Sequence, residues 1–212
     1  MSKMIMNKTI KKVSLSIVSA AALLTSSLAL AEPQVGQPAP DFDVVDSQGN
    51  AVSLSSLKGK TVVMEWTNHD CPFVKKHYES GNMQALQKSA TSDDVVWVSV
   101  ISSGEGKQGN VSADQANSLT EQRGAAPTHV VLDPSGDLGR AYAARTTPHM
   151  FVINETSELV YMGGIDDVPS ADKADIEGAN NYVSAALANL KNNEAVATPT
   201  TRPYGCSVKY SS

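Results

Sequence analysis

The chain has 212 residues, of which 41% are hydrophobic and 18% are charged, with 14 glycines, 10 prolines and two cysteines. This composition excludes collagen-like, coiled-coil and low-hydrophobicity disordered chains, and two cysteines are too few for a disulfide-dense mini-protein or a four-thiolate zinc site. The net charge of -5 argues against a nucleic-acid partner, because neutralising phosphates requires a basic face.

The first 31 residues have the pattern of a secretory signal peptide. Four lysines form a basic start, an apolar run follows from Val13 to Leu30, and Ala29-Leu30-Ala31 is a small-x-small cleavage site. We expect cleavage after Ala31 and a periplasmic or secreted location in a bacterium, where cysteine pairs persist. An uncleaved membrane anchor is the alternative, but no later run is long enough to span, so we expect no membrane contact after cleavage.

The rest of the chain alternates predicted strands and helices. In chain order the patterns indicate a Pro-rich lead-in (35–40), a hairpin (42–54), a strand (60–66), a helix (72 to about 90), a buried strand (95–101), a Gly-rich loop (103–110), a helix (112–123), a strand (129–132), a small helix (137–144), a strand pair (150–153 and 159–162), a helix (170–191), a linker (192–203) and an edge strand (204–210). This order predicts one three-layer α/β/α sandwich over residues 32–191, followed by a flexible tail, 192–212, that carries Cys206.

The turn after the predicted strand 60–66 carries the chemistry. Cys71 stands directly before Pro72, and proline is favoured at the first position of a helix. A thiol at the carboxyl end of a parallel strand lies on the functional edge of the sheet, and the free N–H groups of a helix start stabilise a thiolate. We therefore expect Cys71 to be a reactive thiol that reaches solvent. A buried, inert cysteine is the alternative, although residues 68–70 are polar.

Four stretches follow one another in an order and spacing typical of a known family. Residues 35–42 contain Gly-Gln-Pro-Ala-Pro-Asp-Phe, residues 71–75 read Cys-Pro-Phe-Val-Lys after a Val-Val-Met strand, residues 146–153 read Thr-Thr-Pro-His-Met-Phe-Val-Ile, and residues 160–164 end in glycine. Together they resemble thioredoxin-fold redoxins, in the branch that spans AhpC/TSA peroxiredoxin-like and exported thioredoxin-like proteins. The resemblance implies a thioredoxin-like sandwich with an N-terminal hairpin. It also implies that Thr147 and a cis-Pro148 position a partner sulfur by backbone contacts.

Several residues depart from the family pattern, and these departures limit which reactions we expect. Thioredoxins use Cys-x-x-Cys, but here the last position of that motif is Val74, so no local disulfide can form. Peroxiredoxins carry Thr three residues before the cysteine and an Arg before the later strand. Here Asn68 and Pro148 stand in those places, and Arg145 lies three residues earlier. The pattern therefore favours thiol exchange over peroxide reduction.

The second cysteine, Cys206, lies near the C-terminus and allows three interpretations. It could be a resolving thiol that forms a Cys71–Cys206 disulfide after Cys71 is oxidised. It could instead form a permanent disulfide, which would stabilise the fold by about 4–5 kcal/mol in the chain-entropy model. The third possibility is that Cys206 lies far from Cys71 and pairs with nothing.

Two histidines are candidates for assisting the thiol. His69 is two residues before Cys71, and His149 follows Pro148. Since the resemblance implies that the cis-proline loop packs against the active cysteine, it would bring His69, Cys71 and His149 together. Acid–base assistance is one role for the histidines, and a copper or zinc site formed with Cys71 is another. The third possibility is that both are ordinary polar loop residues.

Four further polar residues are expected to have no part in the chemistry. His77 lies on the predicted helix and His129 enters a strand, so both are expected to be structural. Asp166 and Asp167 follow Gly163-Gly164-Ile165 and could line the same edge of the sheet, but the pattern favours an exposed acidic turn.

The expected function is that of an exported redoxin that acts through Cys71 in thiol–disulfide exchange or in reduction of a small oxidant. Cys71, Cys206, Thr147, Pro148, His69 and His149 are the candidate site residues. We expect no cofactor, because no flavin, nicotinamide or phosphate-loop pattern is visible, and so the reductant would be another thiol protein. A copper-binding or copper-delivery module is the alternative function.

Overall fold

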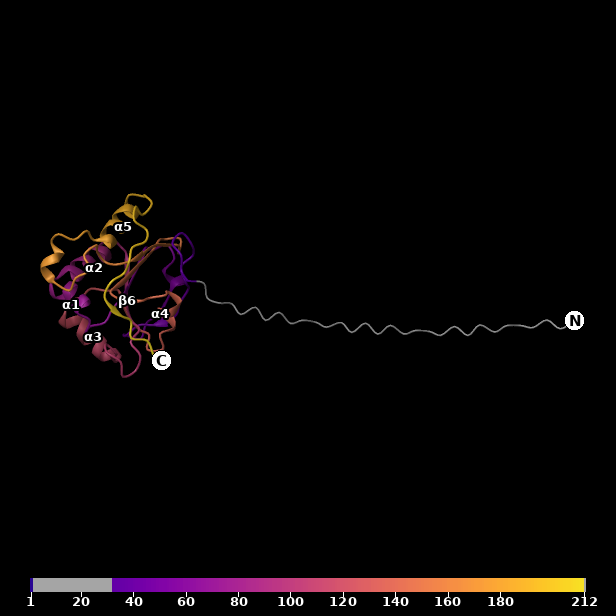
Figure 1. Ribbon diagram of the computed structural model, residues 1–212, viewed down its shortest axis with the longest axis horizontal. Coiled ribbons are helices and arrows are strands. Elements are labelled where there is room, and N and C mark those ends of the chain that lie inside the picture. Colours follow the sequence, from indigo (N-terminus) through magenta and orange to yellow (C-terminus); the bar gives the residue numbers. More distant parts are fainter. Residues whose placement is uncertain (2–31, 212) are drawn as a thin grey trace. The chain divides into compact units, whose positions relative to one another are not determined.

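The computed structural model describes Met1 and residues 32–211, so the predicted signal peptide lies outside the described residues. The centre of the fold is a five-stranded mixed sheet in the order β5-β4-β3-β7-β8. Figure 1 shows the ribbon of the chain, coloured along the sequence. Its strands are β3 (Val62–Trp66), β4 (Val96–Ile101), β5 (His129–Leu132), β7 (His149–Ile153) and β8 (Leu159–Gly163). The first three are parallel, whereas β7 is antiparallel to β3 and β8 is antiparallel to β7.

The two central strands are buried along their whole length. Every residue of β3 and of β7 is buried, as expected for apolar strands covered on both faces of a sheet. Met64 pairs with Phe151 and Trp66 pairs with His149 across the two strands. Because residues directly opposite each other project to the same face, these four side chains lie together on one face of the sheet.

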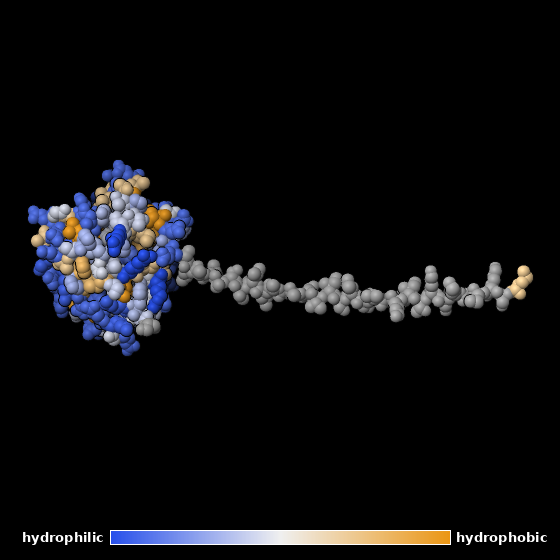
Figure 2. Space-filling view, in the orientation of Figure 1, coloured by the Kyte–Doolittle hydropathy of each residue, from blue (hydrophilic) through white to orange (hydrophobic). Residues whose placement is uncertain are grey.

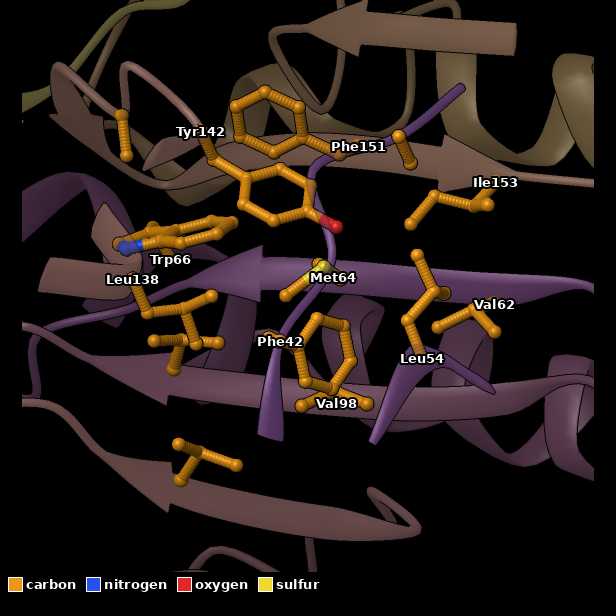
Figure 3. Close-up of a cluster of buried hydrophobic side chains, with 14 of the residues drawn as sticks. Phe42, Leu54, Val62, Met64, Trp66, Val98, Leu138, Tyr142, Phe151 and Ile153 are labelled. Atoms are coloured by element: carbon orange, nitrogen blue, oxygen red, sulfur yellow. The ribbon is translucent and has the colours of Figure 1, made fainter. Parts of the chain in front are cut away.

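The surface drawn in Figure 2 is largely hydrophilic, and the apolar side chains gather in two cores on either side of the sheet. The first core contains Met64, Trp66, Tyr142 and Phe151 (Figure 3). The Trp66 ring lies 5.1 Å from the Phe151 ring and 5.3 Å from the Tyr142 ring, measured between centroids. The elements that cover this face are β1 (Asp43–Val45), β2 (Ala51–Ser53), the 3-10 helix Leu54–Leu57 and α4 (Asp137–Ala141).

The second core lies between the opposite face of the sheet and a layer of helices. The helices of this core are α1 (Pro72–Glu79), α2 (Asn82–Ser92) and α5 (Tyr182–Lys191). They bury Val74, Met83 and Val183 against Trp97 and Tyr161 of the sheet. A further helix, α3 (Ala113–Gln122), packs on β5. These layers confirm the predicted α/β/α sandwich with an N-terminal hairpin.

A buried carboxylate ties β3 to the helical layer. Glu65 is fully buried and accepts hydrogen bonds from the Tyr78 hydroxyl at 2.9 Å, Trp97 Nε1 at 3.0 Å and Ser99 Oγ at 3.1 Å. Gln87 Nε2 donates a further bond at 3.2 Å. A buried charge is tolerated only when it is this well hydrogen-bonded, so Glu65 links β3, β4 and both adjacent helices.

Two predicted helices are each divided in the structure. The segment from 72 to about 90 forms two helices because Gly81, in the left-handed region at φ 77°, turns the chain between them. The segment 170–191 forms only a short 3-10 helix, Lys173–Ile176, before α5 begins. The Asn181 side chain caps α5 by accepting from the Ser184 N–H. Among the described residues, no helix is both long enough and apolar enough to cross a membrane.

The C-terminal segment differs from the expected flexible tail and edge strand. Residues 199–211, here called the strap, run across the loops at one end of the sheet and are held at several points. Met162 N–H donates to Pro199 O at 3.1 Å, Gly104 N–H donates to Lys209 O at 2.8 Å, and the Tyr210 hydroxyl donates to Ala144 O at 2.7 Å. Only Cys206–Ser207 form a strand, β9, which pairs with β6 (Thr146–Thr147).

Candidate active site

The turn between β3 and α1 places Cys71 at the N-cap of α1, with Pro72 at the first helical position. The Cys71 N–H donates to Asn68 O at 3.1 Å and thereby closes the turn. Asn68 Nδ2 donates to Gln108 O at 3.1 Å, which ties the turn to the Gly-rich loop. The local sequence therefore fixes the thiol at the carboxyl edge of the sheet, where the Cys71–Pro72 pattern predicted it.

The Cys71 thiol does not reach solvent, which corrects the sequence expectation. Its side chain is 0% exposed and packs against the second core. The Sγ atom nevertheless faces the proline loop, because it donates a hydrogen bond to Thr147 O at 3.1 Å. The strap lies along this same loop, because β9 pairs with β6.

The Thr147–Pro148 peptide bond is cis, as the resemblance implied. Thr147 presents two groups near Cys71: its carbonyl oxygen, which accepts from the thiol, and its hydroxyl. That hydroxyl is buried and has no hydrogen-bond partner among the described residues. A buried unpaired hydroxyl beside a thiol is available to donate to the thiolate once the proton leaves.

Cys206 lies on the strap directly opposite Thr147 in the β6–β9 ladder. Its thiol is within hydrogen-bonding reach of the Cys71 thiol, and both sulfurs are free. This close approach requires a glycine at position 205. Gly205 has φ 132°, and a Cβ atom added to it would lie only 2.1 Å from Thr147 O. Of the three interpretations of Cys206, the one with distant sulfurs is excluded.

The surroundings shift the pKa values of the two thiols in opposite directions. Burial raises the pKa of Cys71, but the Cys206 thiol, the Thr147 side chain and the Val74 N–H, which can donate to its thiolate, outweigh it, so the net pKa lies below its usual value. Burial raises the pKa of Cys206 to about 11, and the hydrogen bond and negative charge of Cys71 add to that rise. When one of the two thiols ionises, these opposite shifts favour the thiolate on Cys71 and the proton on Cys206.

The structure does not bring His149 to Cys71. His149 lies on the face of the sheet that carries the first core, with its ring 4.4 Å from that of Phe151. Its Nδ1 accepts from the Arg145 N–H at 3.2 Å, and burial lowers its pKa to about 3. The alternation of side chains along β7 explains the difference, because His149 shares a face with Trp66 rather than with Cys71.

His69 lies near the turn, beside Asp70 and close to solvent. Its Nε2 is 3.5 Å from Asp70 Oδ2, and burial is the main reason why its pKa is lowered. Among residues 32–211 no group of three or more His, Cys, Asp or Glu side chains is arranged to hold a metal ion. The described residues therefore offer no cluster of three such side chains that would support the copper alternative.

A buried polar network that the sequence did not predict anchors the strap beside the site. Asp166 is 3% exposed rather than part of an exposed acidic turn, and it accepts from the Tyr204 hydroxyl. Lys76 Nζ lies 3.7 Å from Asp166 Oδ2 and donates to Val168 O at 3.1 Å. His77 Nε2 is 3.2 Å from the same Tyr204 hydroxyl, and burial lowers the His77 pKa to about 4. The one local sign of this network in the sequence is that Lys76 and His77 are adjacent on α1.

Comparisons with known proteins point to one family. The chain matches the Redoxin family over residues 34–179. It is 31% identical over 114 residues to sporulation thiol-disulfide oxidoreductase A of Bacillus subtilis (strain 168), a match that covers 53% of this chain and 63% of that protein. The matched segment is thus less than two thirds of that relative's length.

Two solved structures share the fold at low sequence identity. A hypothetical protein from Sinorhizobium meliloti 1021 superposes with a TM-score of 0.72 at 20% identity, over 86% of this chain and 97% of its own. An uncharacterized conserved protein from Geobacillus kaustophilus gives a TM-score of 0.71 at 24% identity, over 84% and 93%. Since the family match covers most of the domain that holds Cys71 and the cis-proline loop, the chain belongs to the redoxin family.

Proposed function

We propose that the protein is a thiol–disulfide oxidoreductase whose redox centre is the pair Cys71 and Cys206. One observation carries this proposal: the lowered-pKa thiol of Cys71, the Cys206 thiol and the Thr147 backbone meet at one point beside the cis-proline. A thiolate of lowered pKa next to a second thiol is the arrangement that disulfide exchange requires.

The reaction transfers two electrons between this pair and a partner disulfide. In the reducing direction one protein sulfur attacks the partner disulfide, a mixed disulfide forms, and one partner thiolate leaves and takes up a proton. The other protein sulfur then loses its proton and attacks the mixed disulfide. The Cys71–Cys206 bond forms and the second partner thiol is released. A thiol protein or small thiol returns the pair to the reduced state by the reverse steps.

Disulfides fit the site better than peroxides as the oxidant. Arg145, the nearest counterpart of the peroxiredoxin arginine, is 66% exposed on its side chain and pairs with Glu32 at 3.3 Å. The charge of the Arg145 guanidinium is therefore paired with the Glu32 carboxylate at the surface. Peroxide reduction would instead require Cys71 to take an oxygen atom as sulfenic acid, with Cys206 then displacing water to form the disulfide.

Turnover of a disulfide substrate tests this function. Reduced protein is mixed with a peptide disulfide whose cleavage changes its fluorescence, with dithiothreitol as the final reductant. We expect the wild type to accelerate cleavage and Cys71→Ser and Cys206→Ser to lose the acceleration, whereas the exposed Ser92→Ala should retain it. Equal rates for the wild type and both cysteine variants would refute the proposal.

The proposed setting is the bacterial periplasm or cell exterior, after removal of residues 1–31. The basic start, the apolar run and the Ala-Leu-Ala site support this proposal, and a disulfide-handling centre suits an oxidising compartment. N-terminal sequencing of the protein expressed in a bacterium is expected to begin at Glu32. A mature chain that still begins with the lysine-rich segment would contradict export with cleavage.

A further inference from the structure

The two sulfurs of the proposed redox pair differ in their access to solvent. Cys71 is 0% exposed, packed against the second core on one side and against Thr147 on another. Cys206 is partly exposed on the strap, above the same loop. An incoming thiol therefore meets Cys206 first.

The direction of attack strengthens this difference. A thiolate attacks a disulfide sulfur from the side opposite the sulfur that leaves, and the rate depends on access to that side. Cys206 is partly exposed whereas Cys71 is buried, so a thiol that attacks Cys206 can approach from solvent. Cys71 is packed in the second core together with Val74, and both are 0% exposed, so a thiol that attacks Cys71 must displace buried side chains.

A cleft beside the strap offers room for the incoming partner. Its volume is about 570 Å³, and its lining includes Thr146 of β6, Gly205 directly before Cys206, and the charged residues Arg202 and Asp167. The buried network around Asp166 fixes Tyr204 at the edge of this cleft. A thiol compound with charged groups can therefore dock next to Cys206 without entering the core.

We propose that the partner thiol attacks Cys206, so that the mixed disulfide between this protein and its partner forms on Cys206 while Cys71 is the leaving sulfur. This inference rests on the proposed function, because it assigns the order of steps within the same cysteine pair. The usual expectation for a cysteine at a helix start is the reverse, with Cys71 as the sulfur that bonds to the partner.

The electrons and protons balance in two steps. The partner thiolate forms a bond to Cys206 Sγ, the Cys71–Cys206 bond breaks, and its electron pair stays on Cys71 as a thiolate. A second partner thiolate then attacks the partner sulfur of the mixed disulfide, releasing Cys206, which takes up a proton. The products are the dithiol protein and the oxidised partner. The hydrogen bonds that stabilise the Cys71 thiolate make it the better leaving group.

Mapping the mixed disulfide tests the proposal on the wild-type protein. Oxidised protein is first checked for the Cys71–Cys206 disulfide by peptide mass spectrometry, then mixed with reduced glutathione and quenched in acid at early times. Free thiols are blocked with N-ethylmaleimide, and the position of glutathione is read from the peptides. We expect at least about tenfold more glutathione on Cys206, with maleimide on Cys71, than the reverse.

The other outcomes distinguish a wrong order of steps from a wrong proposed function. Glutathione on Cys71 with maleimide on Cys206, or equal amounts at the earliest time, overturns the proposed order while leaving the redox pair intact. Absence of the Cys71–Cys206 disulfide in the oxidised protein, which is seen before glutathione is added, overturns the proposed function and this inference together.

Discussion

At the scale of single residues, Thr147 does more than precede the cis-proline. Its carbonyl oxygen accepts from the Cys71 thiol, which favours the protonated state, whereas its hydroxyl is positioned to donate to the thiolate. Because the hydroxyl has no other partner among residues 32–211, the deprotonation of Cys71 would satisfy it. The residue thus supports both protonation states of one sulfur.

Replacing Thr147 by valine isolates the hydroxyl. Valine keeps the shape but removes the donor, so we expect the pKa of Cys71 to rise and turnover at neutral pH to fall by about tenfold. The ultraviolet absorbance of the thiolate, titrated against pH, gives the shift directly. Thr156→Val, at an exposed turn, is the matched control. An unchanged thiolate titration in Thr147→Val would show that the hydroxyl has no such role.

Two buried histidines make the stability of the fold depend on pH. Burial lowers the pKa of His77 to about 4 and that of His149 to about 3, whereas an unfolded chain titrates near 6.5. Below pH 6.5 the unfolded chain therefore binds protons that the folded chain does not. The stability contributed by both residues is complete above that pH and is lost as the pH falls toward 4 and then 3.

Urea unfolding at pH 7, 6 and 5 measures this dependence. Each histidine is expected to add a slope of about 1.4 kcal/mol per pH unit once the pH is below about 6. His149→Gln cannot take up this proton, so its stability should vary less steeply with pH than that of the wild type. The same slope in both proteins would mean that His149 is charged in the folded state.

At the scale of elements, the strap lies along the loop that the Cys71 thiol faces. It is held by β9, by the Tyr204 network and by the Tyr210 hydroxyl, and only Gly205 allows it to approach Thr147 so closely. A larger residue at position 205 would clash with backbone, which cannot move aside as a flexible side chain can. The strap should then lift locally from β6.

Gly205→Val is expected to expose Cys71 without changing either cysteine. Alkylation of Cys71 by iodoacetamide, measured at a pH where the thiolate is formed, should become about tenfold faster as the strap opens. Gly178→Val is the matched control, since nothing lies within 4 Å of a Cβ atom there. If both variants react at the wild-type rate, the strap does not limit access to the thiol.

At the scale of the whole molecule, local patterns predicted the sheet, the layers and the turn at Cys71. The apolar strands and the Cys71–Pro72 pair are each encoded by neighbouring residues, so their structure could be read from the sequence. The cis bond between Thr147 and Pro148 was implied by the resemblance to redoxins. The placement of Cys206 could not, because it depends on a strap whose contacts come from distant loops. The burial of Asp166 likewise depends on Lys76 and Tyr204, which are far from it in the chain.

The central claim is that Cys71 and Cys206 exchange two electrons as one pair. Equilibrating the protein with mixtures of reduced and oxidised glutathione, then trapping with acid and measuring the mass of the intact chain, tests this claim most directly. We expect one two-electron transition to an intramolecular disulfide in the wild type, and none in Cys71→Ser or Cys206→Ser. A wild-type chain that stays fully reduced at every ratio, or that forms only disulfides between molecules, would contradict the account.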